Sequence, residues 1–122
     1  MTSLTERIAN LDWPMLSAMI DDRGYALTQA LISPEQCEQL AALYDREEGF
    51  RSTVIMARHG FGRGEYRYFS YPLPCVVAQL RAALYPHLAA IANDWAERLG
   101  QQDIWPTRHE ALIDRCHAFG QA

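Results

Sequence analysis

The residues best suited to chemistry gather in one stretch of the chain, residues 56–74. It holds His59, the glycine series Gly60-x-Gly62-x-Gly64 and a charged pair, Arg63 and Glu65. An imidazole can bind a metal or move a proton, and successive backbone N–H groups can cradle an anion. Each of these chemistries must be tested against the spacing that it needs.

Metal binding fails this test. The facial triad of non-haem iron needs two histidines and a carboxylate, and it commonly begins as His-x-Asp or His-x-Glu. None of the four histidines is followed by that pattern. His109-Glu110 starts like the zincin motif His-Glu-x-x-His, but Ile113 stands where the second histidine should be. We therefore predict surface or capping roles for the histidines and no metal ligand.

The other catalytic patterns are also missing. The glycine series lacks the G-x-G-x-x-G spacing and no helix follows it, which favours a flexible hairpin loop over a dinucleotide site. There is no Gly-x-Ser-x-Gly motif, and neither Ser70 nor Cys75 has an evident base. Cys37 and Cys116 are expected on inner helical faces as small buried thiols. No catalytic residue is predicted.

Aromatic and arginine residues alternate after the glycines, a combination that could stack the bases of a single-stranded nucleic acid. They are Arg63, Tyr66, Arg67, Tyr68, Phe69 and Tyr71. The net charge of −4 argues against a nucleic-acid partner, and alternate strand residues face inward. We expect no nucleic-acid binding. A role in binding stays open for Arg63 and Glu65, because a surface ion pair adds little stability.

The elements that position this stretch begin with two short helices within residues 4–20, the second starting at Asp12-Trp13-Pro14. A turn over residues 21–24 and a short strand at residues 25–28 are predicted to follow. Ser33-Pro34-Glu35-Gln36 has the pattern of a capping box and predicts a helix to about Tyr44. The expected inner face of this helix is Cys37, Leu40, Ala41 and Tyr44.

Residues 50–57 and 65–69 read as the two strands of a β-hairpin with a long glycine-rich connection. The longest helix is expected at residues 75–99, where Pro86 should kink or split it. Its predicted core-facing stripe is Val77, Leu80, Leu84, Leu88, Ile91, Trp95 and Leu99. A second capping box at residues 107–110 predicts a last helix, which Gly120 ends. This order of helices and strands predicts an α+β protein with helices supporting a small, mainly antiparallel sheet.

Composition sets the remaining expectations. A chain of 122 residues with 49% hydrophobic and 21% charged residues is typical of one small folded domain. No apolar run approaches the roughly 20 residues that a membrane span needs, and the first 13 residues do not resemble a signal peptide. The three cysteines form no Cys-x-x-Cys pair. We therefore expect reduced thiols, a cytoplasmic location and no membrane partner.

One family resemblance emerges from these residues. Residues 57–69, followed by Tyr71-Pro72-Leu73-Pro74 and a long helix, resemble bacterial 2-oxoglutarate/Fe(II)-dependent oxygenases of the prolyl-hydroxylase-like group. Arg63-Gly64-Glu65 with Phe69 is similar to the Arg-Gly-Asp and downstream aromatic of the hypoxia-type prolyl hydroxylases. The helix after Ser33 resembles that group's support helix, and residues 115–121 resemble the segment that leads into its core strands.

The resemblance implies a double-stranded β-helix (jelly roll), an iron held by His-x-Asp and a distal His, and 2-oxoglutarate anchored by Arg or Lys. No residue here matches those ligand motifs. Residues 1–122 would then be the N-terminal helical and hairpin portion of a larger oxygenase domain, inactive alone. Its hairpin would border the active-site mouth and shape access of a protein or small-molecule substrate. The substrate-access residues that this implies are Arg63, Gly64, Glu65, Tyr66 and Tyr68.

Three explanations for the missing motifs remain open: a piece of a longer oxygenase, a short non-catalytic α/β interaction module, or a partner chain that supplies the other half. We favour the first, because an incomplete jelly roll leaves strand edges unpaired. We expect such edges to self-associate or to bind a protein partner.

Overall fold

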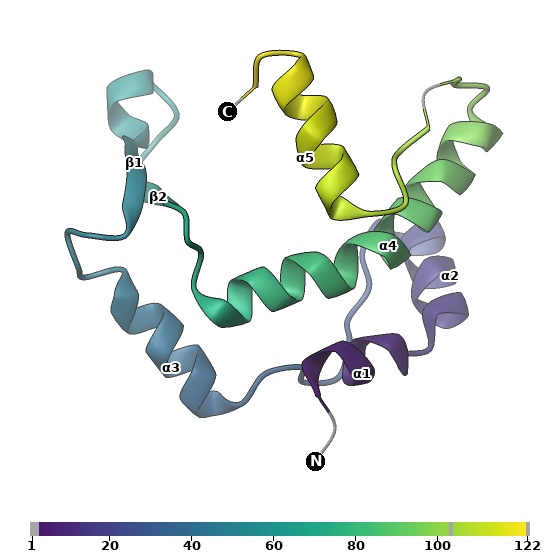
Figure 1. Ribbon diagram of the computed structural model, residues 1–122, viewed down its shortest axis with the longest axis horizontal. Helices are drawn as coiled ribbons and strands as arrows, with labels where there is room; N and C mark the ends of the chain where they lie inside the picture. The colour runs from purple at the N-terminus through teal and green to yellow at the C-terminus, as the bar shows by residue number, and fades with distance from the viewer. Residues whose placement is uncertain (1–2, 103, 122) are drawn as a thin grey trace. The chain divides into compact units, whose positions relative to one another are not determined.

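The computed structural model describes residues 3–102 and 104–121 of the chain. Residues 1 and 2, which belong to the N-terminal segment that does not resemble a signal peptide, therefore lie outside the described residues. Over the described residues the protein is α+β, with five α-helices and one two-stranded antiparallel sheet (Figure 1). The α+β prediction is confirmed, while the jelly roll stays a prediction.

The chain divides into two compact units, Met1–Leu31 with Gln79–Ala122 and Ile32–Ala78. The first contains α1 (Leu4–Ala9), α2 (Trp13–Arg23), α5 (His109–Ala118) and all but the first turn of α4 (Cys75–Arg98). The second contains α3 (Pro34–Leu43), β1 (Phe50–Ile55), the 3₁₀ turn η1 (Met56–His59) and β2 (Glu65–Phe69). That the 122 residues form a single domain stays a prediction.

In the first unit, α2 starts as the sequence predicts but ends later. Asp12 caps it, its carboxylate accepting a hydrogen bond from the Met15 N–H at 3.2 Å. The predicted turn at residues 21–24 is wrong for its first three residues, which form the last turn of α2. Gly24 ends the helix with a φ of +82°, a left-handed conformation that glycine adopts without strain.

The strand predicted at Tyr25–Thr28 does not form. The segment is irregular, and Leu27 is 77% exposed. Its local β-propensity is not enough, because a strand needs a neighbour to accept its backbone hydrogen bonds.

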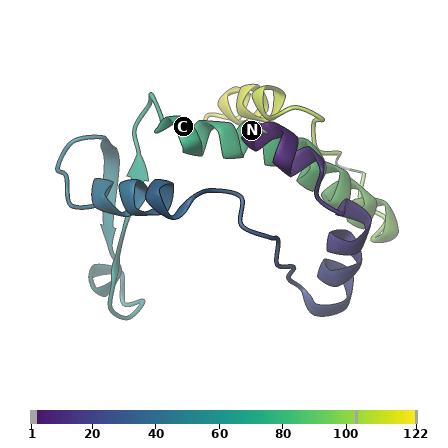
Figure 2. The same ribbon diagram turned by 90° about the horizontal axis from the view of Figure 1, so that it is seen from below.

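Helix α4 continues through Pro86 as one helix, so the alternative that this proline splits it is wrong. Figures 1 and 2 both show α2 beside the C-terminal half of α4. The predicted core-facing stripe is wrong in part. The buried α4 residues are Ala89 and Ala96, which are not in the stripe, while Leu88 and Leu99 are exposed.

By length and composition alone, α4 falls in the range of a membrane-crossing helix, so the prediction that no apolar run is long enough to cross a membrane is wrong by those two criteria. A single helix of this kind is weak evidence, since core helices of soluble proteins have the same length and composition. The expectation that no membrane is involved stays a prediction.

The last helix, α5, begins later than predicted. Its N-cap is Arg108 and no side chain caps it, so the capping box predicted at residues 107–110 is wrong. At its other end Gly120 adopts a φ of +78° after the helix stops at Ala118, as predicted.

In the second unit the predicted capping box of α3 is confirmed. The Gln36 N–H donates to Ser33 Oγ at 3.1 Å, and the Ser33 N–H donates to Gln36 Oε1 at 2.9 Å. The inner face predicted for α3 is wrong as a buried surface: Cys37 is exposed, and no residue of this helix is buried. Cys116, the second thiol predicted to be buried, is half-buried.

Full burial is confined to the first unit within the described residues. It comprises five apolar side chains: Leu4, Ile8, Leu16, Ala89 and Ala96. The second unit therefore depends less on an apolar core than on the polar and aromatic contacts around its hairpin, which is also where the candidate site lies.

Candidate functional site

The hairpin predicted from the sequence forms, although its first strand ends at Ile55 and not at residue 57, because η1 starts at Met56. Its register separates two chemically different faces. Val54 pairs with Tyr66 and Ser52 with Tyr68, so both tyrosines project from one face. Arg67 and Phe69 project from the other face, as their alternation with the tyrosines predicts. We call the first the tyrosine face (Arg51, Ser52, Val54, Tyr66 and Tyr68) and the second the arginine face (Phe50, Glu65, Arg67 and Phe69).

The glycine-rich connection places Arg63 and Gly64 at the start of β2. The Met56 N–H donates to the Gly64 carbonyl at 2.9 Å, which closes the loop. Gly64 has a φ of +129°, and a Cβ there would lie 3.4 Å from Met56 Sδ, so a larger residue would be strained. Arg63 is exposed, and no described carboxylate forms an ion pair with it.

Glu65 instead contacts Tyr44, the C-cap residue of α3. Tyr44 Oη donates to Glu65 Oε2 at 2.6 Å. This hydrogen bond to a carboxylate is the main reason that the pKa of Tyr44 is raised, with desolvation adding to it. Glu65 therefore pairs with this residue at the end of α3, and no ion pair joins it to Arg63 among the described residues.

Arg67 makes the densest set of contacts on the arginine face. Its Nη1 donates to the carbonyls of Tyr44 at 2.8 Å and Arg46 at 2.7 Å, at the end of α3. Its guanidinium carbon lies 4.9 Å from the Tyr44 ring centroid and 5.0 Å from that of Phe50. The guanidinium therefore satisfies helix-end carbonyls and holds the hairpin against α3.

The structure thus gathers Glu65 with two residues that sequence reasoning did not assign to the site, Tyr44 and Arg67. It leaves Arg63, Tyr66 and Tyr68 outside that cluster. A partial signal was present, because Tyr44 ends a strongly capped helix and Arg67 alternates with the tyrosines. Nothing in the sequence indicates that they meet, since they are 23 residues apart.

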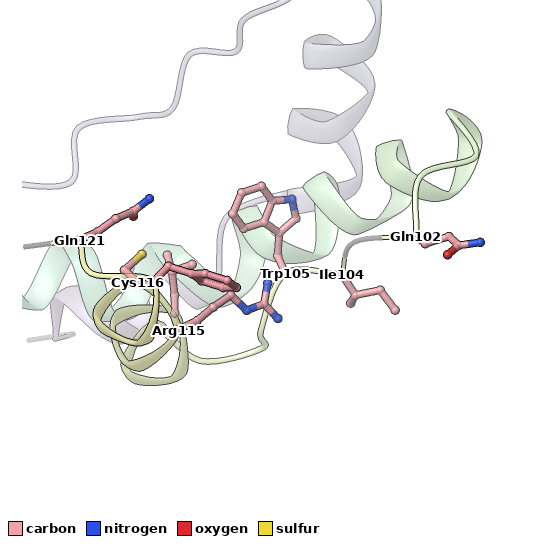
Figure 3. A pocket seen from close by; sticks show the side chains of 8 residues that line it. Gln102, Ile104, Trp105, Arg115, Cys116 and Gln121 are labelled. Carbon is pink, nitrogen blue, oxygen red and sulfur yellow. The ribbon is translucent and has the colours of Figure 1, made fainter.

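The first unit contains a broad apolar groove beside α5, with a volume of about 610 Å³ (Figure 3). Its lining includes Trp105, Arg115 and Cys116. Asn93 fixes one side: its Nδ2 donates to the Trp105 carbonyl at 3.0 Å, and the Trp105 N–H donates to its Oδ1 at 2.6 Å. Among the described residues that line the groove there is one cation, Arg115, and no carboxylate.

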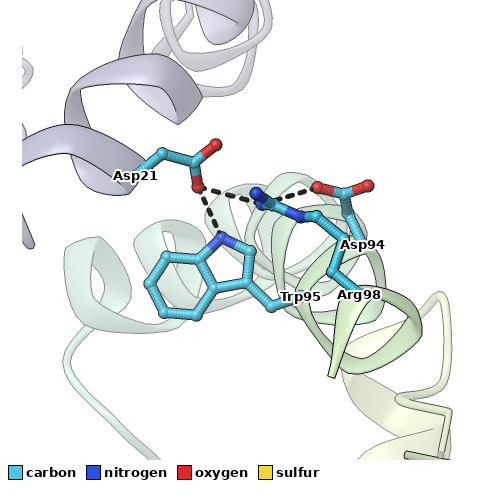
Figure 4. Close-up of polar contacts among 4 residues, drawn as sticks. All are labelled: Asp21, Asp94, Trp95 and Arg98. Carbon is cyan, nitrogen blue, oxygen red and sulfur yellow. Dashed lines mark hydrogen bonds and ion pairs between the residues drawn. The ribbon is translucent and has the colours of Figure 1, made fainter. Parts of the chain in front are cut away.

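Two polar clusters in the same unit have structural explanations. Asp21 Oδ1 accepts hydrogen bonds from Trp95 Nε1 at 2.7 Å and Arg98 Nη2 at 3.0 Å, and Asp94 completes the group (Figure 4). The hydrogen bond from Arg98, then that from Trp95, lowers the pKa of Asp21. The cluster joins α2 to α4 with its groups satisfied by one another.

The second cluster joins α5 to α4. His109 Nε2 accepts from Arg81 Nε at 3.2 Å, and the Tyr85 ring packs edge-on at 5.4 Å between ring centroids. Burial, with the Arg81 charge adding to it, lowers the pKa of His109. A neutral His109 at the first turn of α5 is therefore part of how that helix is attached.

An iron site does not fit the described residues. Nowhere in residues 3–102 and 104–121 do three or more His, Cys, Asp or Glu side chains gather closely enough to hold a metal ion. The facial triad needs three such groups. The hairpin offers one carboxylate, Glu65, which is already bonded to Tyr44.

Residues 64–122 match a family model described as "Oxygenase, catalysing oxidative methylation of damaged DNA". The match begins at Gly64 and includes β2, α4 and α5. It supports an oxygenase-like function, in agreement with the coarser part of the resemblance found in the sequence. It does not single out the prolyl-hydroxylase-like group.

Two curated relatives are also similar to the chain, the uncharacterized proteins MT2286 and Rv2227 of Mycobacterium tuberculosis strains CDC 1551 / Oshkosh and ATCC 25618 / H37Rv. Each is 42% identical over 53 residues, which is 43% of this chain and 23% of the relative. The matched segment thus spans about a quarter of the length of these relatives. No solved structure matches the chain.

Proposed function

We propose that the protein is the N-terminal portion of an Fe(II)- and 2-oxoglutarate-dependent oxygenase with hydroxylase-like chemistry. The observation that carries this proposal is the oxygenase-family match over residues 64–122. The match starts at Gly64, so it covers β2, residues 71–74 and α4 of the segment that resembles 2-oxoglutarate oxygenases, but not residues 57–63. Assignment to the prolyl-hydroxylase-like group is a finer proposal that rests on the sequence resemblance alone.

The role proposed for this chain is substrate access. Iron and 2-oxoglutarate would supply the oxidation, but the described residues do not fit an iron site, so no step through the metal is assigned to them. The proposed access residues are Arg63, Gly64, Glu65, Tyr66 and Tyr68. The Tyr44–Glu65 and Arg67 contacts orient the hairpin strand that carries most of them.

The substrate class has two candidates. A protein or small molecule follows from the resemblance, and damaged DNA follows from the description of the matching family. The expectation that nucleic acid is excluded depends on a whole-chain charge of −4, which does not describe the hairpin. From Gly49 to Pro74 the acidic residue is Glu65 and the basic residues are Arg51, Arg58, Arg63 and Arg67.

Turnover of 2-oxoglutarate tests the proposed function. The 122-residue chain should release no succinate with Fe(II) and 2-oxoglutarate under air, because it lacks the ligands. A gene product that extends into a His-x-Asp motif should release succinate, and omission of Fe(II) is its control. Saturable, tight Fe(II) binding by the 122 residues alone would contradict the proposal, as would an inactive extended protein with that motif intact.

Arg63 can be tested in the same extended protein. Arg63→Ala should weaken substrate affinity if the hairpin borders the active-site mouth, and unchanged affinity would reduce the hairpin to scaffold. A cytoplasmic location and self-association through the hairpin edges are further proposals. Self-association is favoured by the two-stranded sheet, because each strand has one partner among the described residues and its other edge is unpaired there.

A further inference from the structure

The tyrosine face of the hairpin is open, whereas the arginine face is held against α3. Tyr66 is 44% exposed and Tyr68 is 47% exposed. Their rings meet edge to face, with centroids 5.6 Å apart and planes at 85°. Such a pair presents exposed aromatic surface in a defined orientation.

Arg51 adds a cation to this face. It stands at the irregularity in the β1–β2 register, between Phe50 and Ser52, and its guanidinium carbon lies 5.3 Å from the Tyr68 ring centroid. Among the described residues no carboxylate forms an ion pair with Arg51, and the same is true of Arg58. The charge is therefore available to an anionic partner.

Exposed tyrosine rings next to an arginine favour one class of ligand. Exposed aromatic rings beside arginines bind single-stranded nucleic acids, since every base has a π-face to stack and every linkage has a phosphate to neutralise. An apolar peptide would use the rings but leave the arginine charge unpaired, and an acidic peptide would use the charge but not the flat rings. Both components of a nucleotide find a counterpart on this face.

We propose that Tyr66, Tyr68 and Arg51 form a binding surface for single-stranded nucleic acid, with a base stacked on the tyrosines and a phosphate at Arg51. This second proposal rests on the proposed function, because it names the class of substrate that the access hairpin would bind. The surface itself needs neither iron nor 2-oxoglutarate to bind.

Fluorescence anisotropy of a labelled 12-nucleotide single strand tests the surface, with the 122-residue chain in EDTA. Tyr66→Ala and Tyr68→Ala should each weaken binding by about 5- to 100-fold, the equivalent of one lost base stack. Tyr68→Phe should retain binding, because the ring is kept. Tyr25→Ala is the matched control, since Tyr25 is exposed but lies outside the hairpin.

The salt dependence of binding isolates Arg51. Arg51→Gln should reduce the slope of log affinity against log salt by about 0.7, the value for one phosphate contact on a single strand. Arg23→Gln, an exposed arginine on α2, should leave the slope unchanged. A blunt-ended duplex should bind more weakly than the single strand, because its bases are already stacked.

The proposal is overturned if the unmodified chain does not bind the single strand, or if Tyr25→Ala weakens binding as much as the hairpin variants. It is also overturned if light scattering shows that Tyr66→Ala and Tyr68→Ala dissociate a dimer without changing affinity, which would assign the face to a second copy. Succinate release without nucleic acid by the extended protein tests the oxygenase proposal separately, so either proposal can fail while the other stands.

Discussion

Removal of the Arg67 guanidinium should release the hairpin from α3. In Arg67→Ala the chain loses two charge-assisted hydrogen bonds, to the carbonyls of Tyr44 and Arg46, and two cation–π contacts. A hydrogen bond from a charged donor contributes about 1.5–3 kcal/mol and a cation–π contact at a partly exposed site about 0.5–1 kcal/mol. The simple sum is an upper bound.

Two features reduce it. Both hydrogen bonds lie at exposed positions, where water can take the place of the lost donor. The Nε of Arg67 is buried with no hydrogen-bond partner among the described residues, which costs free energy that the alanine variant recovers. We therefore expect a loss of about 2–4 kcal/mol in the free energy that protects the hairpin from local opening.

Hydrogen exchange measured by mass spectrometry is the appropriate assay, because it reports on residues 50–69 and on α4 separately. The expected loss corresponds to exchange about 30- to 1,000-fold faster in the hairpin, or to complete loss of protection, with little change in α4. Arg63→Ala is the matched control: an exposed arginine of the same hairpin, expected to change stability by less than about 0.5 kcal/mol. Equal effects of the two substitutions would refute the role assigned to Arg67.

Three further predictions follow from caps and titrating groups. Ser33→Ala should destabilise α3 by about 1 kcal/mol in hydrogen exchange, because it removes half of the capping box. Glu65→Gln should shift the spectrophotometric titration of Tyr44 to lower pH, because the carboxylate is the main cause of its raised pKa. The pKa of His109 is lowered in the folded chain, so the unfolded chain binds more protons below its ordinary value of 6.5. Protection of α5 should therefore fall as the pH drops below about 6.5, and His109→Gln should remove that dependence.

Each of these has a control in the same chain. Thr107→Ala should leave α5 unchanged, since no side chain caps that helix, and a loss equal to that of Ser33→Ala would contradict the assigned helix start. Glu48→Gln should not move the Tyr44 titration. His117→Gln should retain the pH dependence of α5 protection. If that variant lost the dependence, its assignment to His109 would be wrong.

Much of the local structure could be predicted because its causes lie within a few residues. The Ser33–Gln36 capping box and the Asp12 cap involve side chains that bond backbone groups three residues away. The alternation of Tyr66 and Arg67 separates the two hairpin faces as soon as residues 65–69 are extended.

The tertiary structure decided the contacts between residues that are distant in the chain. Whether Tyr25–Thr28 forms a strand depends on a neighbour that the fold does not place there. Which residues of α4 are buried depends on where other parts of the chain contact it, and full burial falls on Ala89 and Ala96 and not on the predicted stripe.

The candidate site shows the same division. The sequence alone determined that residues 50–69 would form a glycine-linked hairpin with arginines and tyrosines. Only the folded chain brings Tyr44 to Glu65 and Arg67, over 21 and 23 residues. That pairing fixes one face of the hairpin against α3 and leaves the other open. The periodicity of the sequence does not encode it, because the Tyr44 and Arg46 carbonyls that Arg67 binds lie 23 and 21 residues away in the chain.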